Sequence, residues 1–221
     1  MKSPPLLHSE IHGDGGSPFV LMHGLLGSSR NWRSVAKEMD KGFQVHSLDL
    51  RNHGNSFHDQ QTSILEMSND LLRYADHHNL SKFILCGHSL GGKVAMRFAC
   101  DYPDRLHSLV VADIAPRDYP REHHTPTLDA LLSINLRELS SRKQADEQLS
   151  ESIPNWAFRQ FLLTNLVQHE DAFIWKANIT ILRESIGQLS CNPLQKSDRF
   201  HGPTLFIRGG KSGYLRSEHK P

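Results

Sequence analysis

A serine between two glycines carries the clearest chemical signal in the sequence. Gly87, Ser89 and Gly91 form a Gly-x-Ser-x-Gly pattern directly after the apolar run 83–86 and directly before an amphipathic segment that begins at Gly92. A strand that turns at once into a helix crowds its neighbours, so the flanking residues must be small and the central hydroxyl is left exposed. This context predicts that Ser89 is a nucleophile rather than part of a plain structural turn.

Two backbone amides are the expected partners of this serine. An attacking serine needs two N–H donors aimed at the oxygen that becomes negatively charged. We assign them to Leu90, which follows Ser89, and to Leu25. Leu25 lies after the apolar run 19–22, in a loop with two glycines, at the kind of strand end where open α/β sheets place ligands. The alternative interpretation of that loop is a tight turn without a chemical role.

The elements that must position these groups alternate between apolar runs and helical periods. The apolar runs predict strands over residues 19–22, 43–48, 83–86, 109–112 and 204–207. Between the first four runs, apolar residues recur at helical spacing, as at positions 32, 35, 36 and 39. Strands that alternate with helices in this way predict a mainly parallel α/β sheet with helices on both faces.

Residues 117–195 follow a different pattern, because no strand-like run interrupts their amphipathic segments. The apolar spacing predicts helices through Leu128, Leu131 and Leu132, through Ala145 and Leu149, through Phe158, Phe161, Leu162 and Leu166, and through Trp175, Ile179, Leu182 and Ile186. We therefore predict three parts: a core at 1–116, a helical lid at 117–195, and a continuation of the core at 196–221. The lid aromatics Trp156, Phe158, Phe161 and Trp175 either pack the lid interior or line an apolar pocket.

Composition excludes several classes of function. The chain has 221 residues, with 25 Lys and Arg against 24 Asp and Glu, so no basic field for nucleic acid is expected. Its 15 histidines are scattered without zinc-ligand spacing, and three cysteines do not suggest a disulfide framework. The sequence contains no run of 18 apolar residues that would predict a membrane span, and no signal peptide is recognisable. We expect a cytoplasmic protein without a metal site.

Seven segments together resemble one known family. They read HGLLGS at 23–28, DLRNHGNS at 49–56, GHSLGGK at 87–93, DIAP at 113–116, ADEQL at 145–149, RQFLLTNL at 159–166 and GPTLF at 202–206. The chain resembles the α/β-hydrolase fold family, and more narrowly its small esterase branch of bacterial short-chain and acyl-CoA esterases and related mitochondrial hydrolases of animals. The resemblance covers nearly the whole chain.

The resemblance implies a serine esterase. Ser89 would form an acyl-enzyme with small-molecule carboxylic esters or thioesters, the amides of Leu25 and Leu90 would form the oxyanion hole, and no cofactor is implied. Many members carry the triad acid after the strand before the last, but the corresponding loop 208–213 has no carboxylate. The resembling esterases suggest Asp113 instead, whose alternative role is to cap the next turn.

Other polar residues of these segments receive different interpretations. Asp49 and Arg51 are expected to pack and hydrogen-bond a turn, with a substrate contact as the alternative. His88 is not expected to be the base, because adjacent residues of the serine turn project in different directions.

The triad histidine is expected on a loop after the last strand, which in relatives lies beyond residue 221. His219 has charged, strandless surroundings and is not expected to be that base. We therefore expect a truncated chain that lacks the last strand, the terminal helix and the base, and whose exposed sheet edge at 204–207 favours self-association. The alternative function is a non-catalytic, ligand-binding pseudo-hydrolase.

Overall fold

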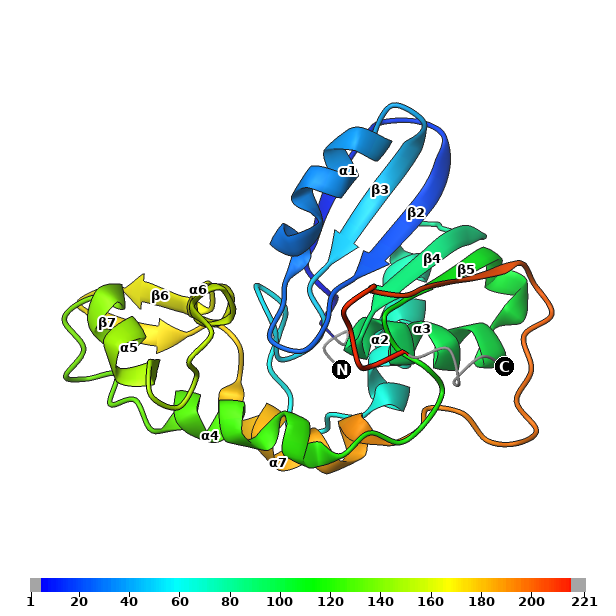
Figure 1. Cartoon of the computed structure of the whole chain (residues 1–221). Coiled ribbons are helices and arrows are strands. Elements are labelled where there is room, and N and C mark those ends of the chain that lie inside the picture. The colour runs from blue at the N-terminus through cyan, green and yellow to red at the C-terminus, as the bar shows by residue number, and fades with distance from the viewer. Residues whose placement is uncertain (1–4, 216–221) are drawn as a thin grey trace.

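Six strands form one sheet in the computed structural model, which describes residues 5–215. In spatial order the strands are β1 (Ser9–His12), β3 (Phe43–Leu48), β2 (Ser17–Met22), β4 (Phe83–His88), β5 (Leu106–Ala112) and β8 (Thr204–Ile207). Only β1 runs antiparallel to its neighbour, and all other pairs are parallel (Figure 1). The prediction of a mainly parallel α/β sheet is confirmed.

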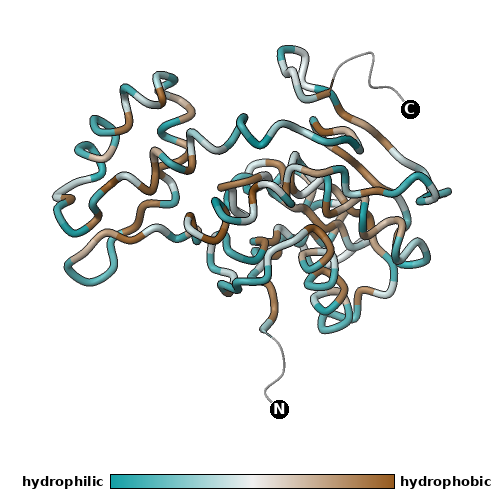
Figure 2. Tube along the Cα trace, turned by 90° about the horizontal axis from the view of Figure 1, so that it is seen from below, coloured by the Kyte–Doolittle hydropathy of each residue, from teal (hydrophilic) through white to brown (hydrophobic). Residues whose placement is uncertain are grey.

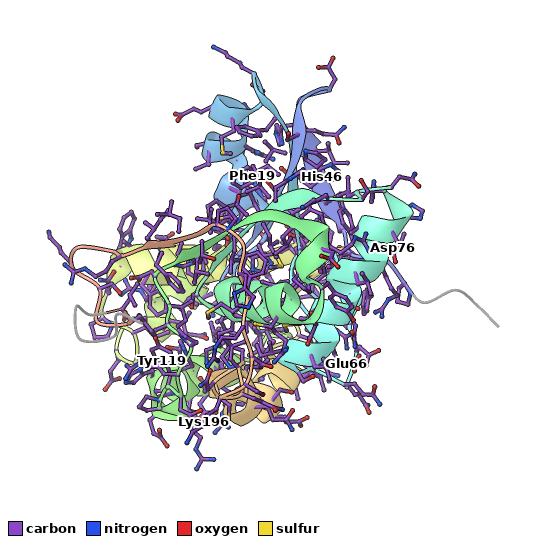
Figure 3. All side chains as sticks on the ribbon, turned by 90° about the vertical axis from the view of Figure 1, so that its right-hand side faces the viewer. Phe19, His46, Glu66, Asp76, Tyr119 and Lys196 are labelled. Atoms are coloured by element: carbon purple, nitrogen blue, oxygen red, sulfur yellow. The ribbon has the colours of Figure 1, made fainter. Side chains whose placement is uncertain are left out.

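Helices cover both faces of the sheet because successive side chains of a strand point to opposite sides. On β2, Leu21 packs towards α1 (Arg33–Met39), whereas Val20 and Met22 join the core beneath α2 (Ile64–His77) and α3 (Leu90–Asp101). On β3, His46 lies on the α2 side, where its Nδ1 is 2.7 Å from the hydroxyl oxygen of Tyr74. Figure 3 shows Phe19 beside α1 and His46 on the side of α2.

The lid leaves the sheet after β5 and returns at β8. It contains η3 (Arg121–His123), α4 (Thr125–Leu132), α5 (Arg142–Leu149), α6 (Trp156–Leu163), β6 (Leu166–His169), β7 (Ala172–Trp175) and α7 (Ile179–Ser190). Two short 3-10 helices, η1 (Ser29–Trp32) and η2 (Pro103–Arg105), belong to the core. In Figure 1, α4 and α7 lie together below the sheet, while α5, α6 and the β6–β7 hairpin form a lobe that Figure 2 shows extending away from it. The exact domain boundaries stay a prediction.

The β6–β7 hairpin corrects the prediction of an all-helical lid. Leu166 and Trp175 were expected on helices, but they face each other as a register pair of two antiparallel strands. Helix α6 ends at Leu163, and a tight turn at Glu170, with φ 52°, reverses the chain. The spacing of Leu166 from Leu162 fits a helix as well as a strand, because one apolar pair cannot distinguish the two periods.

Strand β1 was missed because it has no apolar run. Ser9, Glu10 and His12 are half-buried and Ile11 is exposed, so the strand is held mainly by its backbone ladder with β3. At the opposite edge, Leu205 and Ile207 of β8 are 55% and 48% exposed. Self-association through this edge stays a prediction.

No helix formed by residues 5–215 has the length and apolar character needed to cross a membrane.

Candidate active site

Ser89 lies in a strained turn between β4 and α3. Its φ of 52° and ψ of −113° are rarely adopted by residues other than glycine, and its N–H is held by the carbonyl oxygen of Ala112 at 3.0 Å. The flanking glycines are required sterically. A Cβ at Gly87 would lie 2.1 Å from the carbonyl oxygen of Gly91, and a Cβ at Gly91 would lie 2.6 Å from that of His23. The predicted strand, turn and helix are therefore present, with the helix beginning at Leu90.

The two amides assigned to the oxyanion hole lie on adjoining loops. Leu25 belongs to the turn 24–27, which is closed by a 3.0 Å hydrogen bond from the N–H of Gly27 to the carbonyl oxygen of Gly24. The N–H of Gly91 donates to the carbonyl oxygen of His23 at 3.1 Å and joins this loop to the start of α3. Within residues 5–215, neither the N–H of Leu25 nor that of Leu90 donates a hydrogen bond. Both remain available to an oxyanion.

Asp113 directly follows β5 and is held by the strand beside it. Its N–H donates to the carbonyl oxygen of Ile207 at 2.8 Å, and its Oδ1 accepts the N–H of Gly209 at 3.1 Å. The loop after β8, which has no carboxylate, therefore supplies a backbone amide to Asp113. This arrangement fixes the side chain at the carboxyl end of the sheet rather than using it to cap the following turn.

A cavity of about 620 Å³ brings the predicted residues together between the core and the lid. Ser89, Asp113 and Leu25 line it, and Leu90 lines a smaller adjoining space that Ser89 and Leu25 also reach. Its apolar wall consists of Leu25, Leu26 and Trp32 from the core and Leu128, Phe158, Phe161 and Leu162 from the lid. Among the four lid aromatics considered, Phe158 and Phe161 thus line the cavity, whereas Trp156 is 65% exposed and Trp175 packs against the core.

The structure adds cavity residues that the sequence did not single out. His123, His124 and Tyr214 line the same space, and the rings of His124 and Tyr214 stack with centroids 6.2 Å apart. Burial lowers the pKa of His124 to about 4, with smaller contributions from the positive charges of His123 and Lys93. Their only sequence signal is chain position, because His123 and His124 come after β5 and Tyr214 comes after β8.

Lys93 attaches α3, the helix that follows Ser89, to the lid. Its side chain is 3% exposed, and its Nζ donates to the carbonyl oxygens of Ser190 and Cys191 at 2.6 and 2.7 Å, at the C-terminal end of α7. A positive charge there interacts favourably with the helix dipole. Burial lowers the pKa of Lys93 to about 8.

Two buried histidines support the loops around the site, and one of them, His23, also lines the cavity. The Nε2 of His23 accepts the N–H of Leu50 at 3.1 Å, so its proton lies on Nδ1, which donates to the carbonyl oxygen of Gly24 at 2.7 Å. His53 lies beside it, with ring centroids 5.0 Å apart. Burial lowers the pKa of His23 to about 4 and that of His53 to about 3.

Acidification is therefore expected to destabilise the fold. A histidine with a folded-state pKa near 4 and an unfolded-state pKa near 6.5 takes up its proton only on unfolding, so the stability it confers is complete above pH 6.5 and is lost as the pH falls towards 4. One such group costs about 2 kcal/mol of the free energy of unfolding at pH 5. Urea unfolding at pH 7.5 and pH 5 measures this change.

Matched histidine variants assign this pH dependence. His53→Gln should reduce the difference between the free energies of unfolding at pH 7.5 and pH 5. His107→Gln, at an exposed position, should leave that difference unchanged. Equal unfolding free energies of the unsubstituted chain at pH 7.5 and pH 5 would contradict the prediction.

Asp49 and Arg51 pack and hydrogen-bond the turn after β3, as expected. The Asp49 carboxylate accepts the backbone N–H groups of Ser29 and Asn55 at 2.6 and 2.7 Å. The Nε of Arg51 donates to the Oδ2 of Asp70 on α2 at 2.5 Å, and both side chains are almost fully buried. Neither residue lines the cavity.

His88 lines the cavity but makes no hydrogen bond to Ser89. Burial lowers its pKa, and the nearby charge of Asp113 opposes this effect. Among residues 5–215, no histidine is hydrogen-bonded to the Ser89 hydroxyl or to the Asp113 carboxylate. His219 lies outside the described residues. The described part also contains no group of three or more metal-ligating side chains.

The parallel sheet, the strained serine turn between a strand and a helix, and a cavity at the carboxyl ends of the strands are features of α/β-type hydrolases. Residues 17–137 match the α/β-hydrolase fold family. The chain is 38% identical, over 97% of its length and 72% of that protein, to the sn-1-specific diacylglycerol lipase ABHD11 of Mus musculus. It is 31% identical to the esterase YbfF of Escherichia coli, over 92% of this chain and 78% of that protein.

A solved structure shows the same arrangement. A marine microorganism esterase superposes with a TM-score of 0.94 at 37% identity, over 98% of this chain and 85% of that chain. The chain therefore belongs to the α/β-hydrolase fold family. The predicted fold class, the esterase branch and the class of enzyme are confirmed.

Proposed function

We propose that the chain is a serine esterase that forms an acyl-enzyme on Ser89. The observation that carries this proposal is the convergence of Ser89, Asp113 and the free amide of Leu25 on one cavity. Strained nucleophile turns are kept where the surrounding structure fixes them, and here two glycines and the carbonyl of Ala112 do so. Relatives that are named esterases or lipases support the proposal.

The chemistry follows from these positions. The Oγ of Ser89 attacks the ester carbonyl carbon and gives its proton to a histidine base, while the carbonyl oxygen takes the electron pair and is held by the N–H groups of Leu25 and Leu90. The intermediate collapses, the bond to the leaving alcohol or thiol breaks, and the imidazolium returns its proton to that group. Water then cleaves the acyl-enzyme by the same sequence and releases the carboxylic acid.

Asp113 is proposed to orient the histidine base. The N–H of Gly209 holds one carboxylate oxygen, and no residue in the described part of the chain donates to the other. That oxygen is available to an imidazole N–H, which fixes the tautomer in which the second ring nitrogen accepts the Ser89 proton.

The cavity favours small-molecule esters with an apolar acyl group. Its wall is mostly apolar, with Phe158 and Phe161 on the lid side and Trp32 on the core side. Burying an acyl chain against such a wall is favourable by about 25 cal/mol per Å² of apolar area removed from water. We propose carboxylic esters as substrates and include thioesters, since both present the same carbonyl to Ser89.

Covalent labelling tests the proposal. An alkyl fluorophosphonate should add one phosphonyl group per chain, peptide mapping should locate it on Ser89, and short-chain esters should slow the reaction by competing for the cavity. The control is the Ser89→Ala variant, which should stay unlabelled. Binding of short-chain esters without any labelling of Ser89 would instead support a non-catalytic binding protein and overturn the esterase proposal.

A further inference from the structure

We propose that Asn165, in the lid, positions the turn that carries the Leu25 oxyanion donor. Asn165 lies between α6 and β6, is 4% exposed, and its Nδ2 donates to the carbonyl oxygen of Leu26 at 2.8 Å. The hydrogen bond joins residues 139 positions apart and is a direct lid contact to the residue after Leu25. The inference rests on the proposed function, because it deepens the role of the same site.

The contacted turn has a conformation that needs external support. Leu26 has a φ of 60°, in the left-handed region that a leucine rarely adopts, and its side chain is 3% exposed. Within residues 5–215, the amide of Asn165 is the donor that reaches the Leu26 carbonyl. Loss of that donor leaves a buried carbonyl unsatisfied, which favours rotation of the adjacent peptide groups and a turn of the Leu25 amide away from the cavity.

Asn165 is itself held rigidly, so it can impose a geometry on the turn. Its second Nδ2 proton is directed to the carbonyl oxygen of Leu162 at 3.2 Å, and its backbone N–H donates to the same oxygen at 3.0 Å. Its backbone carbonyl oxygen accepts the N–H of Lys176, the residue after β7, at 2.8 Å. Both amide protons and both backbone groups therefore have partners, which leaves the side chain one orientation.

The same contact connects substrate binding in the cavity with the position of the Leu25 amide. Leu162 and Phe161 of α6 line the same cavity as Leu25 and Leu26, so an acyl group bound there would contact residues on both sides of the Asn165 hydrogen bond. The lid then contributes to the rate of the chemical step as well as to binding. Asn165 is a positioning residue, because it acts through the Leu26 carbonyl and does not line the cavity.

Asn165→Asp is the decisive variant, because it keeps the side-chain volume and replaces the donor with an acceptor. Asn165→Ala serves as a second variant. The matched control is Asn178→Ala, which removes an asparagine that caps α7 of the same lid through the N–H of Ile181 and does not touch the turn 24–27. Circular dichroism and the thermal midpoint establish that each full-chain variant is folded.

Two readouts are expected to change together. The first-order rate of Ser89 phosphonylation by a fluorophosphonate should fall about 10- to 100-fold in both Asn165 variants, since loss of a whole oxyanion donor costs about 10²- to 10³-fold. The fluorophosphonate concentration that gives half of the maximal phosphonylation rate should change less than about twofold. Amide exchange of Gly27, whose N–H closes the turn, should accelerate about tenfold. Asn178→Ala should change neither quantity.

Amide exchange decides the inference independently of reactivity. Unchanged Gly27 exchange in folded Asn165→Asp overturns it, and so do equal effects in Asn178→Ala, which would indicate general loosening of the lid. An unsubstituted chain that does not react with the fluorophosphonate overturns the esterase proposal, while accelerated Gly27 exchange in the Asn165 variants still supports the positioning role.

Discussion

Replacing Ser89 with alanine is expected to lower kcat for ester hydrolysis by about 10⁴- to 10⁶-fold in a chain that includes the base histidine, with KM changed only a few-fold. In the proposed mechanism the Oγ of Ser89 forms the covalent bond, and the substitution leaves the cavity wall and the amides of Leu25 and Leu90 in place. Both constants can be measured from the hydrolysis of p-nitrophenyl acetate and butyrate at ester concentrations of about a millimolar. The absorbance of the released p-nitrophenolate at about 400 nm follows the reaction.

Ser89→Gly separates the chemical role from the conformational one. Glycine lacks the hydroxyl but tolerates the φ of 52° at this position, so this variant should be as inactive as Ser89→Ala and about 1 kcal/mol more stable than it. Urea unfolding measures that difference. Residual hydrolysis above about one part in a hundred in both variants would show that another group attacks the ester.

Replacing Asp113 with asparagine, again in a chain that includes the base histidine, is expected to lower kcat by about 10⁴-fold. Asparagine retains an Oδ1 that can accept the N–H of Gly209, so the side chain should keep its place at the end of β5. The negative charge is lost, and with it the tautomer and the stabilised imidazolium on which the proton transfer from Ser89 depends. The same ester assay measures the loss, and the thermal midpoint should change by only a few degrees.

Asp118→Asn is the matched control for Asp113. Its carboxylate accepts the N–H of Asn192 where the lid rejoins the core, away from the cavity, and the change should alter kcat less than twofold. The double variant Ser89→Ala with Asp113→Asn should be no slower than Ser89→Ala alone, because residues that act as one unit are not additive. Additive losses would remove Asp113 from the triad.

Local patterns were sufficient to predict the turn that carries Ser89 and most of the sheet. The buried strands β2 to β5 appear as apolar runs, and Ser89 lies between glycines whose missing side chains the turn requires. These features depend on a few consecutive residues, so the sequence displays them directly. Strand β1 depends instead on backbone pairing with β3, and its side chains carry no apolar alternation that could reveal it.

Contacts between distant segments could not be predicted in the same way. Nothing in the lid sequence shows that Asn165 reaches the carbonyl of Leu26, or that His124 stacks on Tyr214 in the cavity that Ser89 lines. The hairpin at Leu166 was misassigned because tertiary pairing with Trp175 overrode a helical spacing. The site was therefore predicted as a set of residues, and the structure supplied the connections among them.

The pairing of β5 with β8 also has a consequence for the order of folding. Asp113, the proposed triad acid, obtains its two backbone contacts from Ile207 of β8 and from Gly209 in the loop after it, which the chain reaches only after the whole lid. Closing so long a loop is entropically costly and slows the contacts that depend on it. During synthesis the elbow at Ser89 can form as soon as β4, α3 and β5 are available, whereas the carboxylate acquires its final orientation last. A nascent chain thus passes through a stage in which the turn at Ser89 has formed and the Asp113 carboxylate is not yet anchored, so under the proposed mechanism activity must wait until β8 has paired with β5.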